Sequence, residues 1–95
     1  MDEERKDVLL PPVDIEAEKA VLGSMLKNQD ARADVNAMLS PEDFYLKEHQ
    51  EIYRTMTDME QKGTGIDITT VYSALKQRKT SDMVGGITYL SRLMD

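Results

Sequence analysis

Residues 47–63 read KEHQEIYRTMTDMEQKG, and they decide the fold class because they carry the longest helix that the sequence predicts. Apolar side chains recur there at intervals of four and three residues, which places them on one face of a helix: Ile52, Met56 and Met59. A flanking stripe is formed by His49, Tyr53 and Met56. Gly63 stands where a glycine commonly ends a helix. The stretch therefore predicts a helix from about Lys47 to Lys62.

Two further helices are predicted upstream of this stretch. Asp14 is a good N-cap for the first, and acids in its opening turns complement the helix dipole. The apolar face of this helix contains Val21, Leu22, Met25 and Leu26. Lys27 and Asn28 suit its end. Asp30 is expected to cap a short second helix, whose inward side is predicted to carry Ala31, Val35, Met38 and Leu39.

A compact helix-start signal lies between these helices and the central stretch. Residues 40–43 read SPED, which combines a hydroxyl cap, a proline at the first helical position and two acids. We expect one helical turn here that delivers Phe44 and Tyr45 into the core.

Downstream, Asp67 is predicted to cap another helix, with an inward face of Ile68, Val71, Tyr72 and Leu75. The basic cluster Lys76, Arg78 and Lys79 favours the C-terminal end of this helix. Residues 80–84 are expected to form a connector or a further turn, and Gly85-Gly86 breaks the chain. A last helix carries Ile87, Leu90, Leu93 and Met94. The sequence stops while this pattern is in phase, which suggests truncation.

The predicted fold class is therefore all-α, a small globular bundle of about four main helices plus one or two short helical turns. Residues 1–13 contain two prolines and are expected to form an extended, partly mobile arm. Residues 14–95 are expected to form the helical domain.

Composition narrows the range of functions. The 95 residues include 18 acids and 12 bases, which gives a net charge of −6 and works against unaided binding of DNA or RNA. The sequence has no cysteine, so disulfides and Cys-based metal sites are excluded. No apolar run could span a membrane, and the charged N-terminus is no signal peptide. A soluble cytoplasmic protein is expected.

Candidate reactive groups are few. His49 is the only histidine, and with Glu48, Glu51 and Asp58 nearby it could be imagined as a metal or acid–base site. The two-histidine spacing of metalloproteases is absent, so a partly buried helix histidine with an ordinary hydrogen bond is the preferred interpretation. The glycine pairs lack the spacing of phosphate loops. We therefore predict no catalytic, cofactor-binding or metal-binding residues in this chain.

Four motifs then occur in a recognisable order. Residues 14–23 (DIEAEKAVLG) resemble the opening "IEAEQAVLG" of DnaB-type replicative DNA helicases. Residues 41–45 (PEDFY), followed by His49, are similar to the "PEDFY…H" of that family. Residues 63–67 (GTGID) look like its "RGEPVD" turn, and residues 84–90 (VGGITYL) resemble its "GGxxYL". The turn departs from the family pattern at Lys62, Gly65 and Ile66.

This resemblance implies the N-terminal domain of such a helicase, truncated before the helical hairpin, linker and ATPase. In the family, the hexameric parent unwinds DNA with ATP and Mg²⁺, and its N-terminal domains form a collar and dock primase. The expected partners are the C-terminal helicase-binding domain of primase, other helicase subunits and a possible loader, with neither nucleic acid nor membrane bound directly. ATPase and helicase activity would belong to the parent, so this fragment is not expected to be an enzyme.

The resemblance also points to two partner-binding residues, Glu16 and Tyr89. Tyrosine offers a large amphipathic contact, and glutamate offers a charge that a basic partner can meet. Glu16 could instead only compensate the helix dipole, and Tyr89 could be a core aromatic. Two alternative functions remain open at this point: a purely structural oligomerisation element of the helicase ring, and a small metal-dependent enzyme that uses His49.

Overall fold

A computed structural model of the chain describes residues 13–95. Most of the predicted arm, residues 1–12, lies outside the described residues. The helices are α2 (Ile15–Lys27), α3 (Gln29–Met38), the 3-10 turn η1 (Pro41–Asp43), α4 (Lys47–Gln61), α5 (Ile68–Gln77), α6 (Ser81–Val84) and α7 (Gly86–Leu93). The described part of the chain contains no strand. The all-α prediction is confirmed, and five of the six α-helices have eight residues or more.

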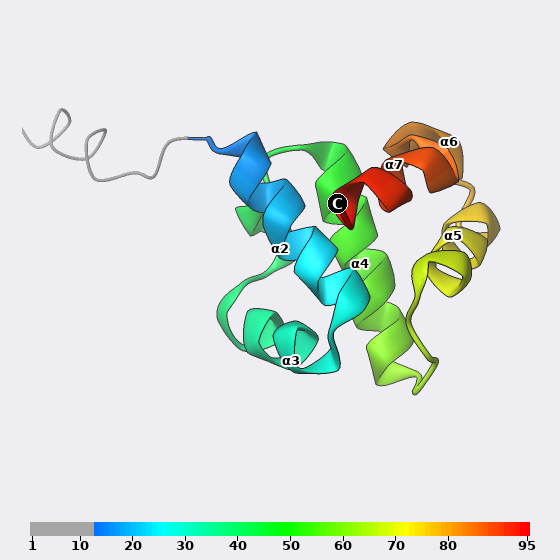
Figure 1. Cartoon of the computed structure of the whole chain (residues 1–95). Helices are drawn as coiled ribbons and strands as arrows, with labels where there is room; N and C mark the ends of the chain where they lie inside the picture. The colour runs from blue at the N-terminus through cyan, green and yellow to red at the C-terminus, as the bar shows by residue number, and fades with distance from the viewer. Residues whose placement is uncertain (1–12) are drawn as a thin grey trace, which may run out of the picture.

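Helix α4 is the central element (Figure 1). It packs against α2 and η1 on one side and against α5 and α6 on the other. Helix α7 closes the globule by contacting α2, α5 and α6. The last helix therefore lies against the first described helix, and residues about 70 positions apart become neighbours, as between Lys27 Nζ and the Met94 carbonyl at 3.0 Å.

Local capping chemistry sets most helix boundaries. Asp14 Oδ1 accepts a hydrogen bond from the Ala17 amide at 3.0 Å, as expected for an N-cap. Asp67 and Thr70 form a reciprocal capping pair, with both bonds 2.9 Å long. Gly63 follows the end of α4 with a φ of 74°, the left-handed conformation that glycine adopts without strain.

The predicted cap of α3 is wrong. Asn28, and not Asp30, caps this helix, because Asn28 Oδ1 accepts from the amides of Asp30 and Ala31 at 2.7 and 3.2 Å. Asp30 lies inside the first turn, where its own amide is one of the groups that need an acceptor. The extended backbone of Asn28 thus ends α2 and starts α3 at a single residue.

The core lies along α4 and is aliphatic and methionine-rich. Its buried members are Leu22, Met25, Leu26, Phe44, Ile52, Tyr53, Met56, Met59, Val71, Leu75, Val84, Leu90 and Leu93. This agrees with the inward faces predicted for α2, α4 and α5. The predicted core positions are wrong at Tyr45 and Met38, which are 64% and 75% exposed, and Ile87 is 41% exposed. Each of these lies near an element end, where no neighbouring helix covers it.

Candidate functional site

A buried histidine joins three helices near one end of the globule. His49 of α4 is fully buried. Its Nδ1 lies 2.7 Å from Glu18 Oε1 of α2, and its Nε2 lies 2.6 Å from the Tyr89 hydroxyl of α7. Both ring nitrogens of His49 thus have a hydrogen-bond partner, one on α2 and one on α7. We call Glu18, His49 and Tyr89 the histidine network.

The histidine network also holds a loop. The second oxygen of Glu18 accepts a hydrogen bond from the Tyr45 backbone amide at 2.6 Å. Tyr45 lies between η1 and α4, and its side chain is exposed although its backbone is anchored. The side chain of Glu18 is only 12% exposed, and its bond to the buried His49 is shielded from water, whereas its bond to the Tyr45 amide lies at the surface. One carboxylate therefore fixes the loop and the histidine together.

The surroundings of this network are acidic. Burial raises the pKa of the Tyr89 hydroxyl, and the carboxylates of Glu48, Glu16 and Glu18 raise this pKa further. Glu16 and Glu18 both lie in the first turn of α2, and His49 links Glu18 to the Tyr89 hydroxyl. We call Glu16, Tyr45, Glu48 and Tyr89 the acidic tyrosine surface.

The two predicted residues differ in accessibility. The side chain of Glu16 is 84% exposed, and among the described residues it pairs with Lys19 alone, at 3.2 Å. Tyr89 is half-buried and its hydroxyl is engaged by His49. Sequence reasoning missed Glu18 and Tyr45 as members of this site. The available signal was that both lie within the two motifs that resemble the family, residues 14–23 and 41–45.

A second cluster joins α4 to the end of α5. The Arg78 guanidinium donates to both carboxylate oxygens of Glu51, at 2.6 and 3.2 Å, and the Thr80 hydroxyl donates to the same carboxylate at 2.8 Å. The Arg78 hydrogen bond lowers the pKa of Glu51, partly opposed by burial, and the Thr80 bond lowers this pKa further. Part of the predicted basic cluster thus clamps two helices together.

A third cluster ties α3 to the rest of the globule. Arg32 is buried, which the sequence did not predict. Its Nε donates to Glu60 at 2.8 Å and its Nη1 donates to the Met25 carbonyl at 2.7 Å. A buried guanidinium needs such partners, since an unpaired buried charge is costly. Every buried side-chain nitrogen and oxygen among residues 13–95 has a hydrogen-bond partner.

The alternative metal site at His49 finds no support in this geometry. Both ring nitrogens lie within hydrogen-bond distance of other side chains, so neither is directed at an open position. Of the predicted companions, Glu51 is bound to Arg78 and Asp58 is paired with Lys62 at 3.1 Å. Within residues 13–95, no three His, Cys, Asp or Glu side chains are grouped so that they could hold a metal ion.

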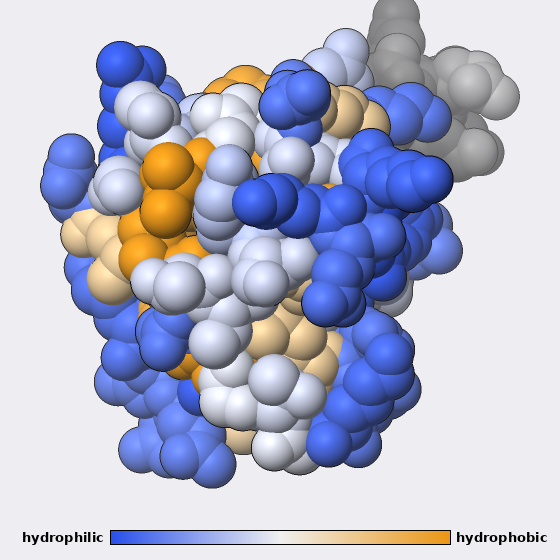
Figure 2. Space-filling view, turned by 90° about the vertical axis from the view of Figure 1, so that its right-hand side faces the viewer, coloured by the Kyte–Doolittle hydropathy of each residue, from blue (hydrophilic) through white to orange (hydrophobic). Residues whose placement is uncertain are grey.

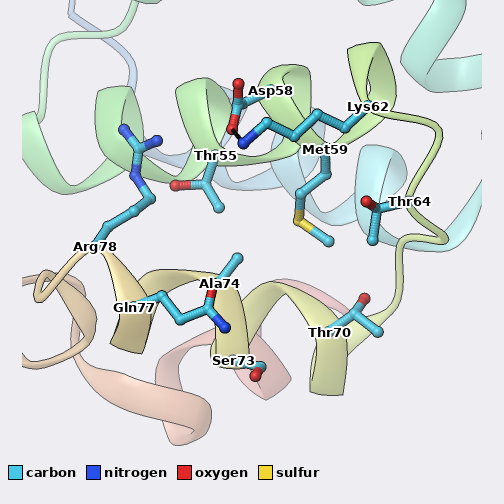
Figure 3. A pocket seen from close by; sticks show the side chains of 10 residues that line it. All are labelled: Thr55, Asp58, Met59, Lys62, Thr64, Thr70, Ser73, Ala74, Gln77 and Arg78. Atoms are coloured by element: carbon cyan, nitrogen blue, oxygen red, sulfur yellow. Dashed lines mark ion pairs between the residues drawn. The ribbon is translucent and has the colours of Figure 1, made fainter.

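An open cleft of about 310 Å³ lies between α4 and α5 (Figure 3). Figure 3 shows side chains of both helices facing this cleft. Its charged lining residues are already engaged, because Lys62 pairs with Asp58 and Arg78 pairs with Glu51. The cleft therefore presents hydroxyl and amide groups, such as those of Ser73 and Gln77, above an apolar floor that includes Met59.

Two other surface properties bear on function. The face that carries α5 to α7 shows hydrophobic side chains gathered among hydrophilic ones (Figure 2). Met83 of α6 and Ile87 of α7 are exposed apolar residues of these helices. No helix within residues 13–95 is long and apolar enough to cross a membrane.

The fold and these clusters define a class of protein, a small all-helical domain. Buried polar side chains join its helices, and tyrosine and carboxylate groups lie on its surface. The chain belongs to the family of the DnaB-like helicase N-terminal domain, whose model matches residues 10–95. This confirms the resemblance that the four motifs indicated.

Curated relatives and a solved structure agree with this membership. The chain is 38% identical over 86 residues to the replicative DNA helicase DnaB of Geobacillus stearothermophilus, covering 90% of this chain and 19% of the relative. It is 42% identical over 82 residues to the replicative DNA helicase DnaC of Bacillus subtilis (strain 168), covering 86% of this chain and 18% of that protein. The chain thus spans less than a fifth of these relatives.

The crystal structure of the N-terminal domain of DnaB helicase from Mycobacterium tuberculosis matches with a TM-score of 0.86 and 41% identity. The match covers 90% of this chain and 62% of that chain. The helical arrangement described here is therefore that of a DnaB N-terminal domain.

Proposed function

We propose that this chain is the N-terminal protein-docking domain of a hexameric replicative DNA helicase that acts in the cytoplasm. It holds the C-terminal helicase-binding domain of primase at the replication fork and contributes to the N-terminal collar. Binding of a helicase loader to the same domain is a further part of this proposal. ATP, Mg²⁺ and DNA unwinding belong to the remainder of the parent helicase.

The observation that carries this proposal is the acidic tyrosine surface. The family resemblance marks Glu16 and Tyr89 as partner-binding. Glu16 is exposed in the first turn of α2, and Tyr89 is linked through His49 to Glu18 of the same turn. Burial, and then the carboxylates of Glu48, Glu16 and Glu18, raise the pKa of the Tyr89 hydroxyl. Such a surface suits a partner with basic side chains, since opposite charges speed encounter and tyrosine supplies contact area. It does not suit direct DNA binding, because phosphates would be repelled.

Isothermal titration calorimetry against the cognate primase C-terminal domain tests the proposal. The informative variant is Glu16→Lys, because this side chain is exposed and forms a surface pair with Lys19. We expect Glu16→Lys to weaken binding and to reduce the dependence of Kd on salt. The loss of stability is expected to stay within about 1 kcal/mol, which is what a first-turn acid contributes through the helix dipole. Absence of any binding by the unsubstituted chain would remove the proposal.

A second candidate function is supported by the exposed apolar side chains Met83 and Ile87. An apolar patch on the α5–α7 face favours a collar element that contacts other helicase subunits. Analytical ultracentrifugation of this chain and of a version extended past residue 95 distinguishes the two. A purely structural collar element predicts self-association of the extended chain and no binding of primase.

A further inference from the structure

We infer that Tyr45 is a second aromatic contact of the proposed docking surface, and that Glu18 and His49 are the positioning residues that set Tyr45 and Tyr89 relative to each other. This inference rests on the proposed function and adds to it the residues that hold the surface in shape.

The first step is that the two carboxylate oxygens of Glu18 bind two different groups. Its Oε2 binds the Tyr45 amide at 2.6 Å, and its Oε1 binds His49 Nδ1 at 2.7 Å. The Tyr45 amide precedes α4 and is not part of the helix ladder, so it needs an acceptor from elsewhere in the chain. A single carboxylate that binds both groups fixes the loop before α4 against the N-terminal turn of α2.

The second step is the continuation to α7. His49 Nε2 and the Tyr89 hydroxyl are 2.6 Å apart, and the two rings are stacked with centroids 5.9 Å apart. An unbroken chain of hydrogen bonds therefore runs from the Tyr45 backbone through Glu18 and His49 to the Tyr89 hydroxyl. Because His49 is fully buried, its two bonds in this chain are shielded from water.

The third step concerns the Tyr45 side chain, which lies outside this chain of hydrogen bonds. The side chain of Tyr45 is 64% exposed, whereas its neighbour Phe44 is buried at 3% exposure. Within residues 13–95, the Tyr45 hydroxyl makes no hydrogen bond, in contrast with the Tyr89 hydroxyl. An aromatic side chain on a fixed backbone loses little conformational entropy when a partner covers it. The exposed Tyr45 ring is therefore available for contact with a partner.

The carboxylates that act on Tyr89 define the partner chemistry. Glu16 and Glu48 act on Tyr89 from α2 and α4. A partner surface that carries arginine or lysine side chains meets these carboxylates and can also stack its cations on the exposed tyrosine ring. The fitting occupant is therefore a basic patch on the folded primase domain of the proposed function.

Contact by Tyr45 is tested by calorimetry with the primase C-terminal domain at fixed salt. Tyr45→Ala is expected to raise Kd about tenfold or more, as for a buried interface tyrosine, with no loss of melting temperature. Met38→Ala is the matched control, because Met38 is 75% exposed on α3 and is expected to bind normally. If the unsubstituted chain binds the primase domain and a folded Tyr45→Ala variant binds it equally well, this inference is wrong. The proposed function is unaffected by that result.

Positioning is tested by double-mutant cycles, since Glu18→Gln and His49→Gln also perturb stability. We expect Glu18→Gln to raise Kd several-fold in the parent chain but to add little in the Tyr45→Ala background. His49→Gln is expected to behave in the same way with Tyr89→Phe. A loss that comes only from partial unfolding multiplies equally in both backgrounds, and that result overturns the positioning roles. If the unsubstituted chain binds no primase domain, the proposed function and this inference fall together.

Discussion

Substitution of Gly23 by alanine separates two physical effects that act in opposite directions. Gly23 lies in the middle of α2, where alanine is favoured over glycine by about 1 kcal/mol in an exposed helix. It is also buried against α7, and a Cβ atom there would lie 1.9 Å from the Leu93 carbonyl oxygen and 3.0 Å from the Leu93 carbonyl carbon. Helix propensity alone predicts a stabilised variant, whereas packing predicts a destabilised one.

The structure favours the packing effect. Both colliding atoms belong to the backbone of α7, so no side-chain rotation relieves the overlap and the helix itself must shift. Overpacking of this kind costs roughly 1–3 kcal/mol, and an overlap of this depth belongs at the upper end. Subtracting the propensity gain leaves a net loss of about 2 kcal/mol. For a domain of this size, that corresponds to a fall in Tm of roughly 8–16 °C.

Thermal and urea unfolding followed by far-UV circular dichroism measures this loss. Gly65→Ala is the control, because no atom lies within 4 Å of a Cβ built at Gly65 and this position has no left-handed φ. Gly65→Ala is expected to stay within about 0.5 kcal/mol of the parent chain, as for an ordinary surface substitution. A Gly23→Ala variant as stable as the parent, or more stable, would refute the close packing of α2 on α7.

Further predictions concern the caps and charged clusters. Asp67→Ala is expected to lower the free energy of unfolding by about 1 kcal/mol, because the Thr70 amide loses its acceptor, and urea titration measures the change. Glu51→Gln is expected to lower stability at neutral pH by about 1–2 kcal/mol, a figure reduced by the partial exposure of Arg78. The pKa of Glu51 is lower in the folded state than in the unfolded state. The stability that the Glu51 carboxylate contributes is therefore present above the unfolded pKa and is lost as pH falls through the folded pKa. The difference in Tm between Glu51→Gln and the parent chain should thus narrow below about pH 4.3. Arg32→Met is expected to cost about 1–3 kcal/mol in urea titrations, because the Met25 carbonyl and Glu60 lose their donor, and a variant as stable as the parent would exclude this cluster as a tie for α3.

The sequence predicts some residues of the candidate site and misses others. The resemblance to the helicase family names Glu16 and Tyr89 as partner-binding residues, and this role stays a prediction. His49 was expected to be partly buried with one ordinary hydrogen bond, but it is fully buried with two. Glu18 lies in the first turn of α2, where an acid complements the helix dipole, but its partners lie 27 and 31 residues away. Such partners depend on how helices cross, which no local pattern specifies.

The sequence by itself determined the all-α class, the ends of most helices and the faces that meet in the core. Caps such as Asp14 and Asp67 act on amides three residues away, and helical periodicity assigns α4 its buried side, so both are local properties of the chain. Only the tertiary structure decided that Tyr45 faces solvent, that Arg32 is buried and that His49 connects three helices. The physical reason is that burial and long-range hydrogen bonding depend on which neighbours cover a residue, and helix packing sets those neighbours.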